Sequence, residues 1–144
     1  MSTRQQQSPR ETRVGVGVLV RSSDGLVLVA RRLAEPGQPL AVPGGKPDPG
    51  ETLEQSAVRE LAEETGLVVD PADARVFDCV LVADDTASWV VAGVEVSLPV
   101  RAADVEPREL EPTRIGGFAW IDPLAPPEGL FPATAAVLER WRPT

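Results

Sequence analysis

Residues 59–66 read RELAEETG and gather three glutamates, Glu60, Glu63 and Glu64, in one short run. On a helix, Glu60 and Glu64 would be neighbours at i and i+4, with Glu63 at i+3 from Glu60. Like charges at i and i+4 destabilise a helix by roughly 0.2–0.5 kcal/mol per pair. Carboxylates in the last turn cost about 0.3–1 kcal/mol each against the helix dipole. Two local rules of helix stability are broken at one place, and such violations are typical of functional sites.

The residues around this run carry signals for where the helix starts and stops. Thr52 and Gln55 fit a capping box at its start, and Gly66 fits the residue that ends a helix. An apolar stripe at helical spacing comprises Leu53, Ala57 and Leu61. We therefore expect a helix over residues 52–65, with the glutamates opposite its buried stripe.

Apolar runs on both sides of this helix predict strands. An Asp-Gly pair at 24–25 marks a tight turn between the first two runs. The segment 35–51 is rich in proline and glycine and predicts a loop with one short extended piece at 40–42. A closing helix is predicted over 132–141. The predicted strands are 14–20, 26–32, 74–82, 89–100 and 115–122.

Strands outnumber helices, and the helices are interspersed among them. This order predicts an α/β (α+β) fold in which a mixed β-sheet is sandwiched between helices. Residues 1–12 are polar and predict a flexible N-terminal tail, whereas residues 13–144 predict a single domain, as suits a chain of 144 residues.

Charge and composition exclude several kinds of chemistry. The formal net charge is −8, which disfavours nucleic acid and anionic membranes as partners. The chain has no histidine and one cysteine, Cys79, so a Ser-His-Asp triad and an internal disulfide are excluded. Any general base must be a carboxylate, a lysine or a similar group. No apolar segment is long enough to span a bilayer, so we expect a cytoplasmic protein.

A divalent cation would turn the repulsion within the glutamate run into attraction. Carboxylate oxygens are the ligands that Mg²⁺ and Mn²⁺ prefer in proteins. The alternative is a solvated acidic helix face that binds nothing. Gly44 and Gly45, in the loop before the helix, permit a close approach of the backbone to a ligand, or they simply form a turn.

The spacing of these residues resembles the Nudix box. Gly45 is followed after five residues by Glu51 and, after seven more, by residues 59–67, of the type Arg-Glu-aliphatic-x-Glu-Glu-x-Gly-aliphatic. So many fixed positions in one stretch make the motif specific. The chain is therefore identified as similar to the MutT-like Nudix hydrolases. A looser match over residues 13–140 resembles a subgroup that includes a plant cytosolic hydrolase of oxidised nucleotides and prenyl diphosphates and a human enzyme that cleaves thiopurine nucleotides.

The resemblance implies a Nudix fold and a Mg²⁺-dependent hydrolase, with Mn²⁺ as an alternative metal. The implied metal ligands are Gly44, through its carbonyl, Glu60, Glu63 and Glu64. Glu63 is either a further ligand or the base that activates water. The implied catalytic residues are Glu51, Arg59, Glu60 and Glu63, of which Arg59 and Glu51 form an orienting ion pair. A fourth acidic ligand is also implied, with the candidates Asp84, Asp85 and Glu95.

Three basic residues are candidates for binding the substrate phosphates. By the resemblance, Arg32 matches an arginine that contacts phosphate, and Arg31 is the second candidate. Lys46 begins the segment KPDPGE, where many subgroup members have HLEFGE. Its side chain either reaches a phosphate or is solvated.

The aromatic candidates have an equally ordinary alternative. Phe118 and Trp120 match aromatic positions in the subgroup, and Trp120 would line a base pocket that Phe131 closes. Ordinary core packing is the alternative for all three. Trp89 belongs either to the core or to an interface.

The implied reaction is hydrolysis of a phosphoanhydride bond in a nucleoside triphosphate or a related nucleoside diphosphate compound, giving a monophosphate and pyrophosphate. Such an enzyme would sanitise modified dNTPs. One alternative is a hydrolase of a prenyl diphosphate, a nucleotide sugar or a biosynthetic diphosphate. Another is a non-catalytic module that senses a nucleotide. The partner is then a small molecule, and the subgroup resemblance leaves a homodimer open.

Overall fold

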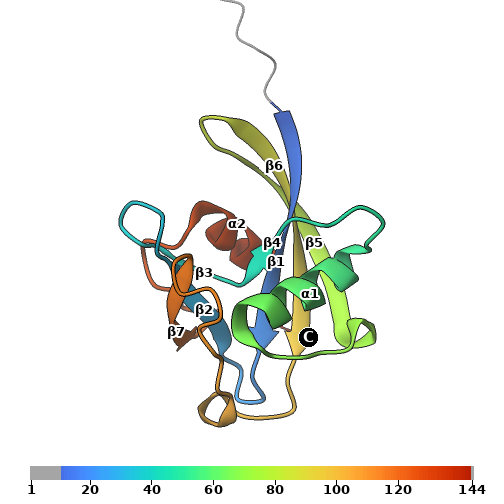
Figure 1. Ribbon diagram of the computed structural model, residues 1–144. Coiled ribbons are helices and arrows are strands. Elements are labelled where there is room, and N and C mark those ends of the chain that lie inside the picture. The colour runs from blue at the N-terminus through green and yellow to red at the C-terminus, as the bar shows by residue number, and fades with distance from the viewer. Residues whose placement is uncertain (1–10, 144) are drawn as a thin grey trace, which may run out of the picture.

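A seven-stranded mixed sheet with one helix on each face forms the core of the computed structural model, which describes residues 11–143 (Figure 1). The strands are β1 (Glu11–Arg21), β2 (Val27–Arg32), β3 (Leu40–Ala41), β4 (Gly44–Gly45), β5 (Ala74–Ala83), β6 (Ala87–Ser97) and β7 (Ile115–Ile121). The helices are α1 (Leu53–Thr65) and α2 (Pro132–Arg140), with short 3-10 turns at Pro71–Asp73 and Ala102–Asp104. This α+β architecture confirms the predicted fold class. Neither helix is long and apolar enough to cross a membrane.

The sheet is built around the parallel pair β1 and β6. The strand order is β3-β2-β1-β6-β5, with β4 also on β1 and β7 on β2. Every other strand pair is antiparallel. The β1–β6 ladder begins at Glu11↔Ala87 and Thr12↔Ser88. The predicted tail of residues 1–12 therefore needs correction at its end, because pairing with β6 extends the strand to Glu11. Residues 1–10 lie outside the described part of the chain.

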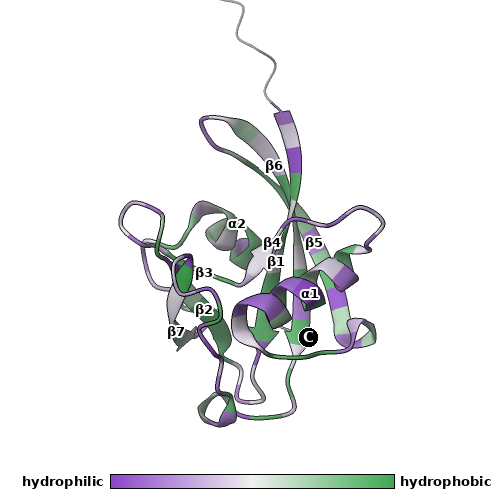
Figure 2. Cartoon of the chain, viewed as in Figure 1, coloured by the Kyte–Doolittle hydropathy of each residue, from purple (hydrophilic) through white to green (hydrophobic). Residues whose placement is uncertain are grey.

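Alternate residues of the central strands point to opposite faces of the sheet. One face packs against α1 in a cluster that comprises Val18, Val20, Leu28, Ala57, Leu61, Val94 and Val96. The other packs against α2 in a cluster that comprises Leu19, Val27, Val91, Val137, Leu138 and Trp141. Figure 2 shows hydrophobic strands in the centre and hydrophilic residues along α1. Each helix thus covers one face of the sheet.

Helix α1 has the boundaries that its capping residues predict. The Gln55 backbone N–H donates to Thr52 Oγ1 at 3.1 Å, and the Thr52 backbone N–H donates to Gln55 Oε1 at 2.9 Å. At the other end, Gly66 takes a left-handed φ of 76° and its N–H donates to the carbonyl of Ala62. Local signals alone therefore place the helix, and with it the angular position of each glutamate.

Strand β4 was not predicted as a strand, and glycine is required there. Gly44 and Gly45 pair with Gly17 and Val16 of β1. A Cβ at Gly44 would lie 2.1 Å from the Val16 carbonyl oxygen, a distance that no side chain tolerates. The two backbones approach this closely only without a side chain at position 44, which brings the glycine pair beside α1.

Candidate active site

Glu60 and Glu64 of α1 turn toward the glycine pair of β4. Glu64 is buried, with 3% of its surface exposed, and its Oε2 accepts a hydrogen bond from the Gly44 N–H at 3.1 Å. The Glu60 carboxyl lies against Gly45, where a Cβ would stand 2.3 Å from Glu60 Cδ. The helix spacing and the absence of side chains on β4 therefore place two carboxylates at one backbone segment.

Arg59 contacts the other three carboxylates of the site, those of Glu51, Glu60 and Glu63. Its Nε and Nη2 donate to the two carboxyl oxygens of Glu51 at 2.8 and 3.0 Å. Its Nη1 donates to Glu60 at 3.0 Å and to Glu63 at 3.2 Å. The expected ion pair between Arg59 and Glu51 is thus present. Nη2 also donates to the carbonyl of Lys46 at 2.9 Å, which ties the loop before α1 to the helix.

Glu51 is held as an anion. The guanidinium of Arg59 lowers its pKa to about 2, together with the Asp48 N–H and the Ser56 hydroxyl. Charged hydrogen bonds of this kind favour the ionised carboxylate. The same contacts raise the pKa of Arg59 above its ordinary value. Glu51 and Arg59 therefore form a permanently charged brace between the loop and α1.

Glu64 and Glu60 resist ionisation in the metal-free protein. Burial raises the pKa of Glu64 to about 8, although the hydrogen bond from the Gly44 N–H acts to lower it. The nearby carboxylates of Glu60 and Glu111 raise it further. Burial also raises the pKa of Glu60, although the hydrogen bond from Arg59 acts to lower it. A buried carboxyl gains most from a cation, because the cation removes the penalty that burial places on its charge.

The donor set fits a hard divalent cation, although it is not a closed cage. Among residues 11–143, no three acidic side chains converge on one point. Glu60 and Glu63 turn to Arg59, and Glu64 turns to the Gly44 N–H. The contact between Gly44 and Glu64 is made by the Gly44 N–H, and the role of the Gly44 carbonyl as a metal ligand stays a prediction. All groups at hand are nevertheless oxygen donors of the kind that Mg²⁺ accepts, and Mg²⁺ keeps several waters in such sites.

The candidates for a fourth acidic ligand lie in the β5–β6 turn and on β6. Asp84 accepts hydrogen bonds from the backbone of Thr86 and Ala87 in the β5–β6 turn. Asp85 is exposed in the same turn. Glu95 is buried on the α2 face, where its carboxylate accepts a hydrogen bond from the Trp141 indole N–H. Glu95 therefore lies on the opposite face of the sheet from α1, whereas Asp84 and Asp85 stay predictions as metal ligands.

Two residues near the cluster were missed by the sequence reasoning. Glu111 lies close enough to raise the pKa of both Glu60 and Glu64. Arg114 opposes this rise at Glu64 and donates to Glu111 at 2.9 Å. Both lie in the irregular segment before β7, which has no periodic pattern that would have placed them.

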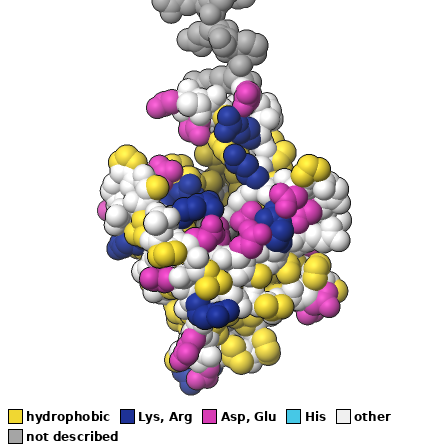
Figure 3. All heavy atoms as spheres, in the orientation of Figure 1, with side chains coloured by type: hydrophobic (Ala, Val, Ile, Leu, Met, Phe, Trp, Pro, Cys, Tyr) yellow, Lys and Arg dark blue, Asp and Glu magenta, His cyan; other side chains and the backbone are white. Residues whose placement is uncertain are grey.

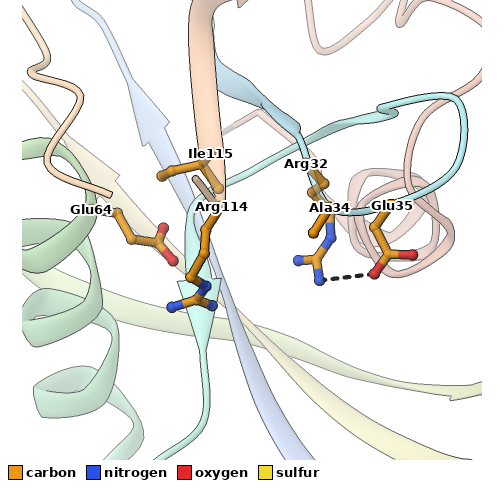
Figure 4. Close-up of a pocket in the computed structure, with 6 residues that line it drawn as sticks. All are labelled: Arg32, Ala34, Glu35, Glu64, Arg114 and Ile115. Atoms are coloured by element: carbon orange, nitrogen blue, oxygen red, sulfur yellow. Dashed lines mark hydrogen bonds and ion pairs between the residues drawn. The ribbon is translucent and has the colours of Figure 1, made fainter. Parts of the chain in front are cut away.

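A hollow opens beside Glu64 and Arg114 (Figure 4). Its lining comprises Arg32, Ala34, Glu35, Glu64, Arg114 and Ile115. Arg32 lies 4.0 Å above the Phe131 ring, and its buried Nε has no hydrogen-bond partner. Its Nη2 has one weak contact, with Glu35 at 3.4 Å. The hollow thus contains two guanidinium groups with capacity to bind an anion.

The remaining candidates are divided between the core and the surface. Phe118 and Trp120 are partly buried and pack against the hydrophobic cluster under α1, which agrees with the core alternative, while a role in a base pocket stays a prediction. Arg31 is exposed and donates to the Gln38 carbonyl, away from the hollow. Lys46 lies over the Trp89 ring. Figure 3 shows acidic side chains at the middle of this face with basic side chains on more than one side of them.

Comparison with known proteins agrees with this fold. The NUDIX domain model matches residues 11–141. An RNA pyrophosphohydrolase of Erythrobacter litoralis is 43% identical over 58 residues, which are 40% of this chain and 35% of that protein. An 8-oxo-dGTP diphosphatase of Escherichia coli is 38% identical over 60 residues, 40% of this chain and 46% of that protein. The chain therefore spans less than half of the length of these two relatives.

A solved structure matches along nearly its whole length. The MutT NUDIX hydrolase of Burkholderia pseudomallei superposes with a TM-score of 0.77 at 29% identity, covering 90% of this chain and 98% of that one. The chain belongs to the Nudix hydrolase family and has its α+β fold.

Proposed function

We propose that the protein is a metal-dependent pyrophosphohydrolase that cleaves a phosphoanhydride bond of a nucleoside triphosphate, giving a monophosphate and pyrophosphate. The observation that carries this proposal is the buried Glu64. Its carboxylate is unfavourable without a cation, and it borders a hollow that contains two arginines. A buried carboxylate beside two guanidinium groups suits a polyphosphate that carries a metal ion.

Glu60 and Glu64 would hold the cation, together with the backbone at Gly44. A divalent metal such as Mg²⁺, or Mn²⁺ in its place, supplies neutralisation of phosphate charge and a bound water of lowered pKa. Glu63 is the most exposed of the three glutamates, with 54% of its side chain accessible. We assign to it the acceptance of the proton from the attacking water, because a solvated carboxylate passes a proton on to bulk water.

Arg32 and Arg114 would bind the phosphate chain in the hollow. The partners of both are replaceable, since Arg32 has a weak contact with Glu35 and Arg114 pairs with Glu111 at the surface. Phosphate oxygens accept paired hydrogen bonds from guanidinium groups and would take over these contacts. The buried Nε of Arg32 would gain a partner that it lacks in the free protein.

The names of the relatives suggest two kinds of substrate, 8-oxo-dGTP and RNA. We propose the free nucleotide, because the net charge of −8 opposes a long polyanion. Removal of modified dNTPs is the corresponding role. The resemblance of the segment before α2 to the plant and human subgroup agrees with a free nucleotide.

The test is turnover of a substrate panel in the presence of Mg²⁺. The panel contains ATP, dGTP, 8-oxo-dGTP, a nucleotide sugar and geranyl diphosphate, with pyrophosphate and phosphate assayed separately. Glu64→Gln should abolish turnover while the fold is retained. Glu54→Gln, on the same helix but outside the cluster, is the matched control and should retain the turnover of wild type. Pyrophosphate release that survives in Glu64→Gln would refute the proposal.

A further inference from the structure

Trp89, near the start of β6, has a cation on its ring from each of two other segments. The Arg13 guanidinium carbon lies 5.7 Å from the ring centroid, and Lys46 Nζ lies 5.6 Å from it. Both distances are within the range of a cation–π contact. The indole N–H donates to Asp84 Oδ2 at 3.1 Å, which fixes the ring by its edge. The side chain packs partly against the core cluster on the α2 face and is partly exposed.

This ring lies next to the glycine pair that contacts the glutamate cluster. Trp89 Cε3 and the Gly45 carbonyl oxygen each lie 3.5 Å from the position that a Cβ on Gly15 would take. Lys46 follows Gly45 directly, and its carbonyl accepts from Arg59. Because Glu60 lies against Gly45, the two-residue strand β4 separates the indole from the carboxylates. Trp89 and the Glu60 carboxylate thus lie on two sides of the same short strand.

The charges around the ring suit an anionic aromatic ligand. The Lys46 ammonium has no ion pair with any carboxylate in residues 11–143, whereas Arg13 pairs with Glu11 at 2.8 Å. A protein with net charge −8 thus places an unneutralised cation at an aromatic face beside its acidic cluster. A nucleobase stacks on an indole, and the phosphates that it carries attract cations. A prenyl chain offers no aromatic face for the same ring.

We propose that Trp89, with Arg13 and Lys46, forms the subsite that takes the nucleobase end of a nucleoside polyphosphate. This rests on the proposed function and names its substrate class. Phe118 and Trp120, the earlier candidates for stacking on the base, contribute to the core beneath α1 instead. Base recognition then comes from the α2 face of the sheet at β1 and β6, and metal binding comes from α1.

The experiment measures binding without turnover. The full-length protein with Mg²⁺ is titrated with α,β-methylene-ATP, which resists cleavage between the α and β phosphates, and separately with inorganic tripolyphosphate, which has no base. Wild type, Trp89→Leu and Trp89→Phe are compared by calorimetry, and tryptophan emission is recorded in wild type and Trp89→Phe. Circular dichroism confirms that each variant is folded. Because hydrolysis is assayed apart from binding, loss of the subsite and loss of the enzymatic function are distinguishable.

Trp89→Leu should raise the Kd for α,β-methylene-ATP at least about fivefold, because stacking of a base on an aromatic side chain is lost. The Kd for tripolyphosphate should change by less than about twofold, since the phosphates bind elsewhere. In wild type the nucleotide should quench tryptophan emission, and Trp89→Phe should remove the quenching while nucleotide binding persists. An equal loss for both ligands, an unchanged Kd, or quenching that survives in Trp89→Phe would each overturn the proposal.

Discussion

Replacing Glu64 by glutamine should make the metal-free protein more stable at alkaline pH. Burial raises the pKa of Glu64 from its ordinary 4.5 to about 8. A carboxyl whose pKa is raised on folding binds a proton more tightly in the native state, so stability is full below pH 4.5 and declines as the pH rises through about 8. At about 1.4 kcal/mol per pH unit, the whole interval corresponds to an upper bound of about 5 kcal/mol. Glutamine has no such dependence and keeps an oxygen to accept the Gly44 N–H.

The assay is urea unfolding of wild type and Glu64→Gln at pH 5, 7 and 9, with EDTA and then with Mg²⁺. Contributions of other titrating groups cancel in the difference between the two proteins. Without metal, the variant should be more stable than wild type by at least about 2 kcal/mol at pH 9 and by little at pH 5. Mg²⁺ should stabilise wild type and leave the variant almost unchanged, because a cation that binds the native state adds to its stability.

A difference between the two proteins that is constant from pH 5 to pH 9 would refute this reasoning, since Glu64 would then ionise normally in the native state. Glu54→Gln, in the first turn of the same helix, should follow wild type at every pH. The activity of Glu64→Gln should be lost under conditions where its stability is higher. A purely structural glutamate predicts no such separation of stability from activity.

Three further substitutions test the parts of the site separately. Gly45→Ala should reduce kcat on the order of 100-fold with the fold retained by circular dichroism, because the new Cβ would stand 2.3 Å from Glu60 Cδ and displace that carboxylate. Arg59→Lys should lower the free energy of unfolding by about 1–3 kcal/mol in urea, because lysine cannot form the two-pronged contact with Glu51. Arg114→Ala should raise KM for the nucleotide about tenfold, measured in steady-state kinetics, because one guanidinium of the hollow is lost; an unchanged KM would place Arg114 outside the phosphate path.

The parts of the site that lie on α1 were predictable because their signals are local. The capping residues and the glycine after Thr65 set the limits of α1, and the helical repeat then fixes which glutamates are neighbours. The spacing from Gly45 to Glu51 and Arg59 predicts the rest of the cluster, because the short loop between β4 and α1 restricts where these residues lie relative to the helix. Local geometry thus accounts for the two carboxylates at β4.

Features that depend on distant segments were not predictable. Glu11 and Thr12 are polar, and only the ladder with β6 makes them a strand. Glu111 and Arg114 reach the cluster because the loop before β7 returns to the end of α1, where the Arg108 N–H donates to the Thr65 carbonyl. A loop of this kind has no periodicity from which its path follows.

The aromatic residues were predictable in part. Phe118 and Trp120 are two apart on β7 and therefore share a face of the sheet. Both join the cluster under α1, so alternation along the strand already favoured a common role in the core. Trp89 is likewise two residues from Val91 on β6 and packs partly against the cluster on the α2 face. Its neighbours Arg13 and Lys46 come from β1 and from the loop after β4, and pairing between distant strands brings them together.

The distribution of charge explains why one helix tolerates its crowded glutamates. Arg59 contacts Glu51, Glu60 and Glu63, so most of the repulsion along α1 is compensated within the protein. Glu64 receives only a backbone N–H and is the most buried of the group. The residual cost is therefore concentrated in one carboxyl at the edge of the hollow, where the proposed cation would relieve it. A compensating lysine in that place would stabilise the protein without metal and compete with a cation, so the lack of a cationic ion-pair partner at Glu64 among residues 11–143 is the feature that agrees with the proposed metal binding.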